Sequence, residues 1–277
     1  MIITTAILSA VLFSCIGEEM TCDKELIVVQ RIGEGGNVDT RGTVISSNTD
    51  LKGETFGLFG SLTPNSSAPQ QYFNASARVN ADLTATISPL QYWPGLQNAS
   101  MRFFSWYPFS GANPGEMVLS YTANAATSNH VDVLAAVSGP AWVEGVNIHF
   151  YHTLTKVTFT FKKVAPVPDE VTIEKIEFQN VGQSGKLTVA EIPTTTTKNN
   201  KPKFVWSDVT TGSIASTPTG NKTVTEDATL IGDTFLMLPT DNFSATAKIV
   251  VTTNYGDYEF LLSEIVTKNR HTKIEIS

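Results

Sequence analysis

Residues 157–162 read Val157-Thr158-Phe159-Thr160-Phe161-Lys162, and this short stretch decides the fold class. Apolar side chains occupy every second position, and polar side chains occupy the positions between them. A period of two places one kind of side chain on each face of an extended chain. The stretch therefore predicts a half-buried β-strand.

Similar patterns extend in both directions from this strand. The alternation breaks once among Ile173, Ile176 and Phe178, which predicts a β-bulge. Residues 254–257 predict the turn of a hairpin. No segment has the periodicity and caps of a long amphipathic helix. The Thr- and Asn-rich residues 193–218 predict a loop around one apolar island. Further strands are expected over residues 24–32, 55–62, 101–107, 117–122, 229–238, 247–253, 258–262 and 273–277.

Many short strands separated by turn residues predict an all-β protein built from β-sandwiches. A length of 277 residues suits one or two domains. Pro166 and Pro168 follow a predicted strand near the middle of the chain, which favours a domain boundary between residues 145 and 165. We expect an N-terminal β-sandwich domain over residues 24–153 and a C-terminal one over residues 154–277.

The composition excludes several classes of protein. Charged residues make up 16% of the chain and the formal net charge is -7, whereas a nucleic-acid binder needs a basic face. Hydrophobic residues make up 41%, which is enough for a packed core and speaks against global disorder. The abundant Thr, Ser and Asn are typical of the surface of an exported β-protein.

The N-terminus has the features of an export signal. Residues 1–13 carry no charge and are mostly apolar, but they are too few for a membrane-spanning helix of about 20 residues. They fit the apolar core of a signal peptide, although the usual preceding positive charge is missing. Residues 12–15, Leu-Phe-Ser-Cys, resemble a bacterial lipobox.

We therefore expect a lipoprotein signal peptide over residues 1–14, lipidation of Cys15 and a lipidated tether over residues 15–23. An ordinary secreted chain with an incidental or buried Cys15 thiol is the alternative. Glu18-Glu19, just behind this cysteine, resembles a surface-export signal of Bacteroidetes lipoproteins.

The residues that carry chemistry do not form an enzyme-like pattern. His149 and His152 are three apart in a predicted strand and so point to opposite faces. The chain has no zinc-like Cys/His spacing, no Gly-x-Ser-x-Gly elbow and no phosphate-binding glycine loop. We expect no catalytic residue, no metal and no cofactor, and we expect His152 to be a hydrogen-bonded structural residue.

The four tryptophans suggest an alternative function. An exposed indole can stack on the apolar face of a sugar, whereas a buried one only packs the core. One possible function is therefore that of a surface glycan-binding lipoprotein that uses Trp206 or Trp142, and it is the alternative to the function that the family resemblance implies. The other two tryptophans are Trp93 and Trp106.

Several segments, taken in order, resemble the Bacteroidetes fimbrillin-like family, the pilins of type V pili. The resemblance covers most of the chain after the signal peptide. It rests on Thr40-Arg41-Gly42, Phe56-Gly57-Leu58-Phe59, Tyr92-Trp93-Pro94, Phe103-Phe104-Ser105-Trp106-Tyr107-Pro108, Asp132-Val133-Leu134-Ala135-Ala136 and the His-containing residues 148–157.

The resemblance implies two transthyretin-like β-sandwich domains in tandem, in agreement with the strand pattern. It also implies a fimbrial subunit that is exported as a lipoprotein, assembled by protease-triggered donor-strand exchange, and used in cell adhesion. The expected location is the outer membrane and the cell surface, in a fimbrium. The expected partners are other pilin subunits and, before processing, the outer membrane, with an unidentified surface ligand and no nucleic acid.

In this family a trypsin-like protease trims the precursor after a basic residue and so frees the first strand. Arg41 is the first candidate because it lies in a Gly-rich segment beyond that strand. Arg31 is the alternative, although it falls within the strand region, and Arg41 could also be an ordinary surface residue. The chain leaves little room for a donor segment before Ser277, which favours a tip or accessory subunit. The removable strand would comprise Glu25, Leu26, Ile27, Val28, Val29 and Gln30.

Overall fold

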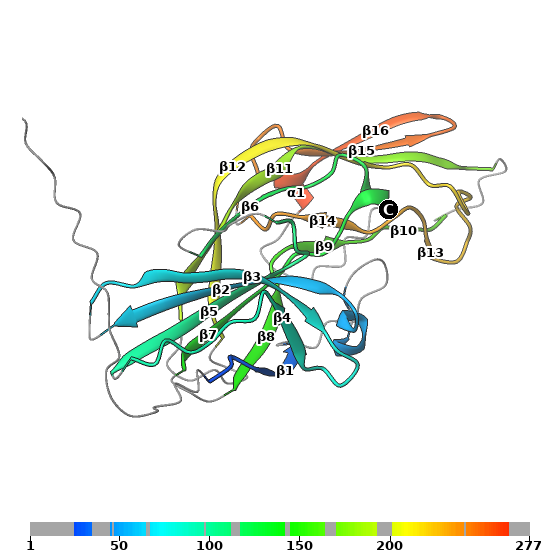
Figure 1. The fold of residues 1–277 in the computed structure, drawn as a ribbon. Helices are drawn as coiled ribbons and strands as arrows, with labels where there is room; N and C mark the ends of the chain where they lie inside the picture. Colours follow the sequence, from blue (N-terminus) through cyan, green and yellow to red (C-terminus); the bar gives the residue numbers. More distant parts are fainter. Residues whose placement is uncertain are drawn as a thin grey trace, which may run out of the picture.

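The structure is a computed structural model and is almost entirely β, which confirms the predicted fold class (Figure 1). Cys15, Arg41, Trp142, the predicted strand 273–277 and the two prolines at the expected domain boundary lie outside the described residues. The residues that the structure describes are 25–34, 45, 47–64, 67–96, 98–111, 117–141, 145–163, 170–192, 201–240 and 242–265.

Seven strands form a closed barrel in the first half of the chain, in the order β1-β4-β3-β2-β5-β7-β8. One continuous apolar cluster fills its interior. The strands are β1 (Val29–Glu34), β2 (Thr55–Pro64), β3 (Gln70–Val79), β4 (Ala85–Ser88), β5 (Ala99–Tyr107), β7 (Leu134–Ala141) and β8 (Val146–His152), with a 3₁₀ turn at Asn48–Leu51.

The two aromatic motifs of the sequence lie on neighbouring strands of this barrel. In the antiparallel pairing of β2 with β5, Gly57 stands opposite Trp106 and Phe59 stands opposite Phe104. A Cβ atom on Gly57 would come within 2.1 Å of the Trp106 ring, which is fully buried. The glycine therefore makes the space in which this indole packs against the sheet.

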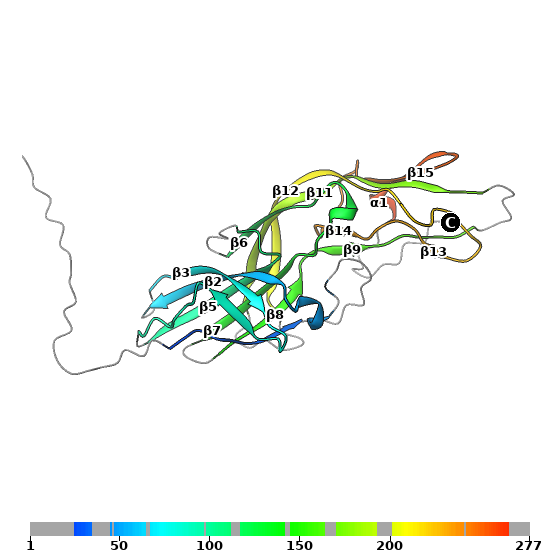
Figure 2. The same ribbon diagram turned by 45° about the vertical axis from the view of Figure 1, so that its right-hand side comes forward.

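The second half of the chain forms a sheet in the order β12-β11-β15-β16 and two small two-stranded sheets, β14-β9 and β10-β13. Figures 1 and 2 show these elements at one end of the molecule and the barrel at the other. The strands are β9 (Thr155–Val157), β10 (Thr160–Phe161), β11 (Ile173–Glu191), β12 (Lys203–Ser216), β13 (Thr229–Leu230), β14 (Phe235–Met237), β15 (Lys248–Thr253) and β16 (Gly256–Leu261), followed by helix α1 (Leu262–Ile265).

The alternating stretch 157–162 has the predicted faces but is not one continuous strand. Phe159 is buried, whereas Thr158 and Thr160 are exposed. Around Phe159 the chain changes partner, because β9 pairs with β14 and β10 pairs with β13. Phe159 packs against three other phenylalanines at the centre of the second apolar cluster, Phe161, Phe178 and Phe235.

The hairpin and the bulge were predicted correctly. Strands β15 and β16 pair antiparallel around a turn at Asn254 and Tyr255. The register between β11 and β15 shifts between Ile173 and Lys175, within the region where the alternation breaks.

Two predictions made from local sequence were wrong. Residues 193–218 were expected to form a loop, but residues 203–216 of this segment form β12. Its aromatic and β-branched residues favour an extended chain, and β11 supplies the partner for nearly its whole length. These residues are Phe204, Val205, Trp206, Val209, Thr210, Thr211 and Ile214. Residues 229–238 were expected to form one strand, but the structure has two short ones, β13 and β14, because each pairs with a different neighbour.

The two halves of the molecule are joined by a strand and by a shared apolar cluster. Strand β6 (Val118–Thr122) lies within the first predicted domain, yet it pairs with β11 in the second half. The division at residues 153/154 therefore stays a prediction. The shared cluster contains Phe59, Phe104, Trp106, Leu119, Val133, Ala135 and Leu187.

A buried histidine connects the same two halves. His130 is only 3% exposed. Its Nδ1 accepts a hydrogen bond from the backbone N–H of Leu236 at 3.0 Å, and its Nε2 lies 2.8 Å from the carbonyl oxygen of Asn124. Because Nδ1 accepts, the proton of the neutral ring lies on Nε2 and is donated to Asn124. Burial lowers the pKa of His130, and this outweighs the opposing effects of the Asn124 carbonyl and the nearby Asp233 charge.

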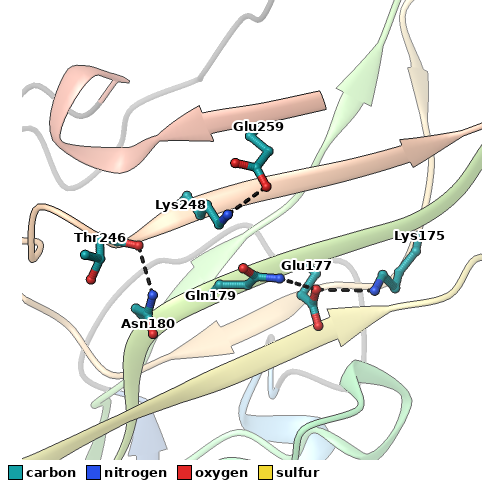
Figure 3. Close-up of polar contacts among 7 residues, drawn as sticks. All are labelled: Lys175, Glu177, Gln179, Asn180, Thr246, Lys248 and Glu259. Carbon is teal, nitrogen blue, oxygen red and sulfur yellow. Dashed lines mark hydrogen bonds and ion pairs between the residues drawn. The ribbon is translucent and has the colours of Figure 1, made fainter. Parts of the chain in front are cut away.

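The outer face of the β11-β15-β16 sheet is polar (Figure 3). The Lys248 Nζ atom on β15 lies 2.7 Å from a Glu259 carboxylate oxygen on β16. The Glu177 carboxylate accepts hydrogen bonds from Lys175 Nζ at 3.3 Å and from Gln179 Nε2 at 2.7 Å. On the β11 side, Asn180 donates to the carbonyl oxygen of Thr246 at 3.0 Å. Interleaved charges of both signs on a sheet disfavour association with other sheets. This face is therefore suited to water.

We predict that Gly57→Ala destabilises the protein by about 1–3 kcal/mol, because the new methyl group collides with a buried indole. Thermal or urea unfolding measures the change. Gly220→Ala is the matched control, since nothing lies within 4 Å of a Cβ at that position. Equal stability of the two variants would contradict the packing described here.

We predict that the free energy of unfolding falls as the pH is lowered below about 6.5. The unfolded chain then binds a proton on His130, whereas the folded protein, with its lowered pKa, does not. His130→Gln should cost about 1–3 kcal/mol at neutral pH and should weaken this pH dependence. Urea titrations of both proteins between pH 5 and 8 measure it, and parallel stability curves would refute the assignment.

Candidate functional site at the first strand

Strand β1 closes the barrel because it lies between β4 and β8 (Figure 1). It runs parallel to β8 and antiparallel to β4. On the β8 side Val146 N–H donates to the Val28 carbonyl at 2.8 Å, and on the other side Ile32 N–H donates to the Leu83 carbonyl at 2.8 Å. The strand thus satisfies backbone groups on both neighbours.

The chain before β1 continues this pairing with residues 91–93. Ile27 N–H donates to the Gln91 carbonyl at 2.9 Å, and Trp93 N–H donates to the Glu25 carbonyl at 2.9 Å. These bonds frame an antiparallel bridge between Leu26 and Tyr92. Residues 25–34 are therefore held by hydrogen bonds along most of their length.

The side chains of this segment alternate between core and surface. Ile27 is 2% exposed and Val29 is fully buried, whereas Leu26 and Val28 are 39% and 44% exposed. The register with β8 then shifts between Val29 and Arg31. The next inward side chain is consequently Ile32, also fully buried.

The inward side chains are part of the barrel core. Ile27, Val29 and Ile32 belong to the same apolar cluster as Val146, Ile148 and Phe150 of β8. Loss of the segment would leave this cluster open to water and leave β4 and β8 with unpaired N–H and C=O groups. Both costs favour its replacement by another extended chain.

The predicted site residues fall in different places. Residues 25–30 lie in the paired segment, but β1 itself begins at Val29 and extends to Glu34, beyond the predicted end of the strand. Arg31 lies inside β1, opposite Asn147 of β8, and its side chain is exposed. Cys15 and Arg41 lie outside the described residues.

Sequence reasoning missed the two neighbours that hold this segment. Strand β4 and residues 91–93 were not predicted to pair with the N-terminal segment. Alternation in residues 85–88 and 90–93 was a usable signal for extended structure. No local pattern could indicate that the partner of these residues lies about 60 positions earlier in the chain.

An arginine and a histidine, Arg31 and His149, lie on the outer side of this seam. A Cβ atom on Gly33 of β1 would come within 3.0 Å of the His149 Nδ1 atom on β8. Partial burial lowers the pKa of His149, and the positive charge of Arg31 lowers it further. His149 is therefore mainly neutral at neutral pH, beside a permanently charged arginine.

Other candidate residues have structural contacts. Trp93 and Trp106 are buried, and Trp206 donates its indole N–H to the Thr153 carbonyl at 2.9 Å and packs against Tyr121. His152 contacts the buried Asp132 carboxylate at 2.7 Å. The described part of the chain contains no group of three or more His, Cys, Asp or Glu placed to hold a metal ion. None of its helices is long and apolar enough to cross a membrane.

Comparison with known proteins gives a family and a shared fold. A family model described as fimbrillin-like matches residues 40–277. A proposed cell adhesion protein from Bacteroides uniformis has 14% identity and a TM-score of 0.54, with 86% of this chain and 85% of that chain covered. One from Bacteroides ovatus has 15% identity and a TM-score of 0.52, with 86% of each chain covered. No curated protein sequence matches.

We predict that Ile32→Ala lowers the free energy of unfolding by about 2–4 kcal/mol, because it leaves a cavity in the barrel core. Val28→Ala, on the exposed side of the same segment, should change it by less than about 0.5 kcal/mol. Urea unfolding compares the two variants. If they are equally stable, the segment does not pack as described.

Proposed function

The chain belongs to the fimbrillin-like family of surface fimbrial subunits, and we propose that it assembles by exchanging its first strand for an extended segment of another subunit. The observation that supports this most directly is the position of β1, which closes the barrel between β4 and β8. It is also the first strand of the described chain, so one cut behind it can free it while the other six strands keep their pairings with one another.

The incoming segment must reproduce the pattern of the strand that it replaces. Its apolar side chains have to match Ile27, Val29 and Ile32, which gives apolar positions i, i+2 and i+5. The interval of three residues follows from the register shift between Val29 and Arg31. Backbone pairing supplies affinity in such strand addition, and the buried alternate side chains supply specificity.

Processing precedes this exchange in our proposal. Cleavage after Arg41 would separate all of β1 from the rest of the chain. Cleavage after Arg31 would leave Ile32 and Gly33 paired with β8, and Arg31 lies in hydrogen-bonded strand that a protease cannot bind without local unfolding. Arg41 is therefore our proposed site, with Arg31 as the alternative.

Anchoring and location complete the proposal. Acylation of Cys15 would hold the precursor on the outer membrane at the cell surface. Cleavage would then separate the rest of the protein from the acylated N-terminal segment. The other pilin subunits are its partners, and cell adhesion is its role. The tip or accessory position stays a prediction. The half-buried, hydrogen-bonded Trp206 gives no specific support to a glycan-binding function.

We predict that brief trypsin treatment of the precursor yields one stable core that begins after Arg41. A synthetic peptide of residues 25–34 should then bind this core once the cleaved segment has been washed out under mild denaturant. Peptide binding is measured by fluorescence anisotropy, and the cut by mass spectrometry. Cleavage at many sites would overturn the proposal. So would a trimmed core that is folded and lacks residues 25–34 but binds no peptide.

Two altered peptides provide matched controls. Serine at Ile27, Val29 and Ile32 removes only inward side chains and should weaken binding at least 100-fold, since each loses on the order of 1.5–3 kcal/mol of apolar burial. Serine at Leu26 and Val28 removes outward side chains and should change binding less than about threefold. Equal effects would exclude the proposed orientation of the groove.

A further inference from the structure

A small apolar face covers the outside of the N-terminal segment. Leu26 and Tyr92 are bridge partners in antiparallel pairing, so their side chains lie on the same face. Val28, two residues after Leu26, and Leu90, two residues before Tyr92, are exposed as well. These four side chains, Leu26, Val28, Leu90 and Tyr92, we call the outer patch, and they are 39%, 44%, 56% and 39% exposed.

The outer patch is distinct from the groove. Ile27, between Leu26 and Val28, and Trp93, next to Tyr92, are buried in the barrel core. Strand exchange uses that inward side, whereas the outer patch faces away from the core. Contiguous exposed apolar side chains on a soluble protein usually mark a contact surface.

Half of the outer patch lies on the segment that the proposed cleavage removes. Leu26 and Val28 would leave with it, whereas Leu90 and Tyr92 would remain on the core. The complete patch therefore exists only in the precursor. Its occupant must be something that the precursor meets before processing.

We infer that the outer patch rests on the lipid surface to which the precursor is anchored. This inference rests on the proposed lipidation of Cys15 and removal of the first strand. The ten residues 16–25 separate Cys15 from Leu26, so fully extended they place the patch within about 40 Å of the acyl chains. The anchor thus keeps the patch close to the membrane throughout the life of the precursor.

The size and chemistry of the patch fit a membrane better than a protein partner. Four partly exposed side chains are far fewer than the roughly 20–30 residues that each side contributes to a stable protein interface. A tethered surface needs only weak affinity, because the anchor supplies a high effective concentration. Tyrosine suits this boundary, since its ring is apolar and its hydroxyl stays in water.

The test uses the mature chain, residues 15–277, with Cys15→Ser so that no acyl chain contributes. Neutral phosphatidylcholine vesicles are the probe, at a lipid concentration on the order of millimolar so that it matches the effective concentration an anchor supplies. Flotation measures the bound fraction. The double variant Leu26→Ser/Leu90→Ser should bind about tenfold less, as expected for loss of two half-exposed leucines. Tyr255→Ser/Tyr258→Ser removes exposed aromatic residues near and on β16 and should bind as the unaltered protein does.

Three results would overturn the inference. They are no vesicle binding by the unaltered chain, equal loss in both double variants, and self-association in solution that the Leu26→Ser/Leu90→Ser change abolishes. The last would make a second copy of the chain the occupant. Unfolding curves show whether each variant is folded before binding is measured.

Trimmed protein separates this inference from the proposed function. After the cut and removal of residues 25–34, vesicle binding should fall about tenfold, while binding of the 25–34 peptide to the groove should appear. If the peptide binds the core but the precursor binds no vesicles, the membrane contact is refuted and strand exchange is not. Failure of the peptide to bind, with vesicle binding intact, would count against strand exchange alone.

Discussion

The structure depends on the pairing of one strand with two neighbours that are distant in sequence. β1 receives and donates backbone hydrogen bonds on the side of β8 and on the side of β4 and the residues around it. Its inward side chains complete a core that the other six strands leave open at one seam. Backbone satisfaction and apolar burial therefore both depend on the same six to ten residues.

The rest of the molecule stabilises the barrel and does not compete with it for association with another chain. Interleaved charges cover the outer face of the second sheet (Figure 3), so that face has little tendency to recruit an added strand or sheet. At the junction, β6 and a shared apolar cluster tie the barrel to the second half. A buried neutral His130 adds hydrogen bonds between the same two parts. The barrel is thus braced through β2, β5 and β7, whereas β1 lies between β4 and β8.

Sequence patterns predicted the faces of strands more reliably than their partners. The alternation at residues 157–162 correctly placed Phe159 in the core, but it could not show that the chain changes partner there. Residues 203–216 looked like a loop because they lie in a wider segment, 193–218, that is rich in Thr and Asn. They form a strand because β11 offers a partner along most of their length. In the same way, an apolar run marked residues 26–29 as a strand, while nothing local pointed to β4 or residues 91–93.

The sequence by itself determined that the protein is all-β, that its first segment is an apolar extended stretch, and that it resembles the fimbrillin-like family. These properties are encoded locally, since a period of two and a set of ordered motifs need no knowledge of the fold. Only the tertiary structure decided which strands close the barrel, where the register shifts, and that Leu26 pairs with Tyr92 while Leu26 and Val28 stay exposed. Such features arise from hydrogen bonds between residues far apart in the chain. The free energy of those pairings depends on both partner strands and is not determined by the local sequence of either one.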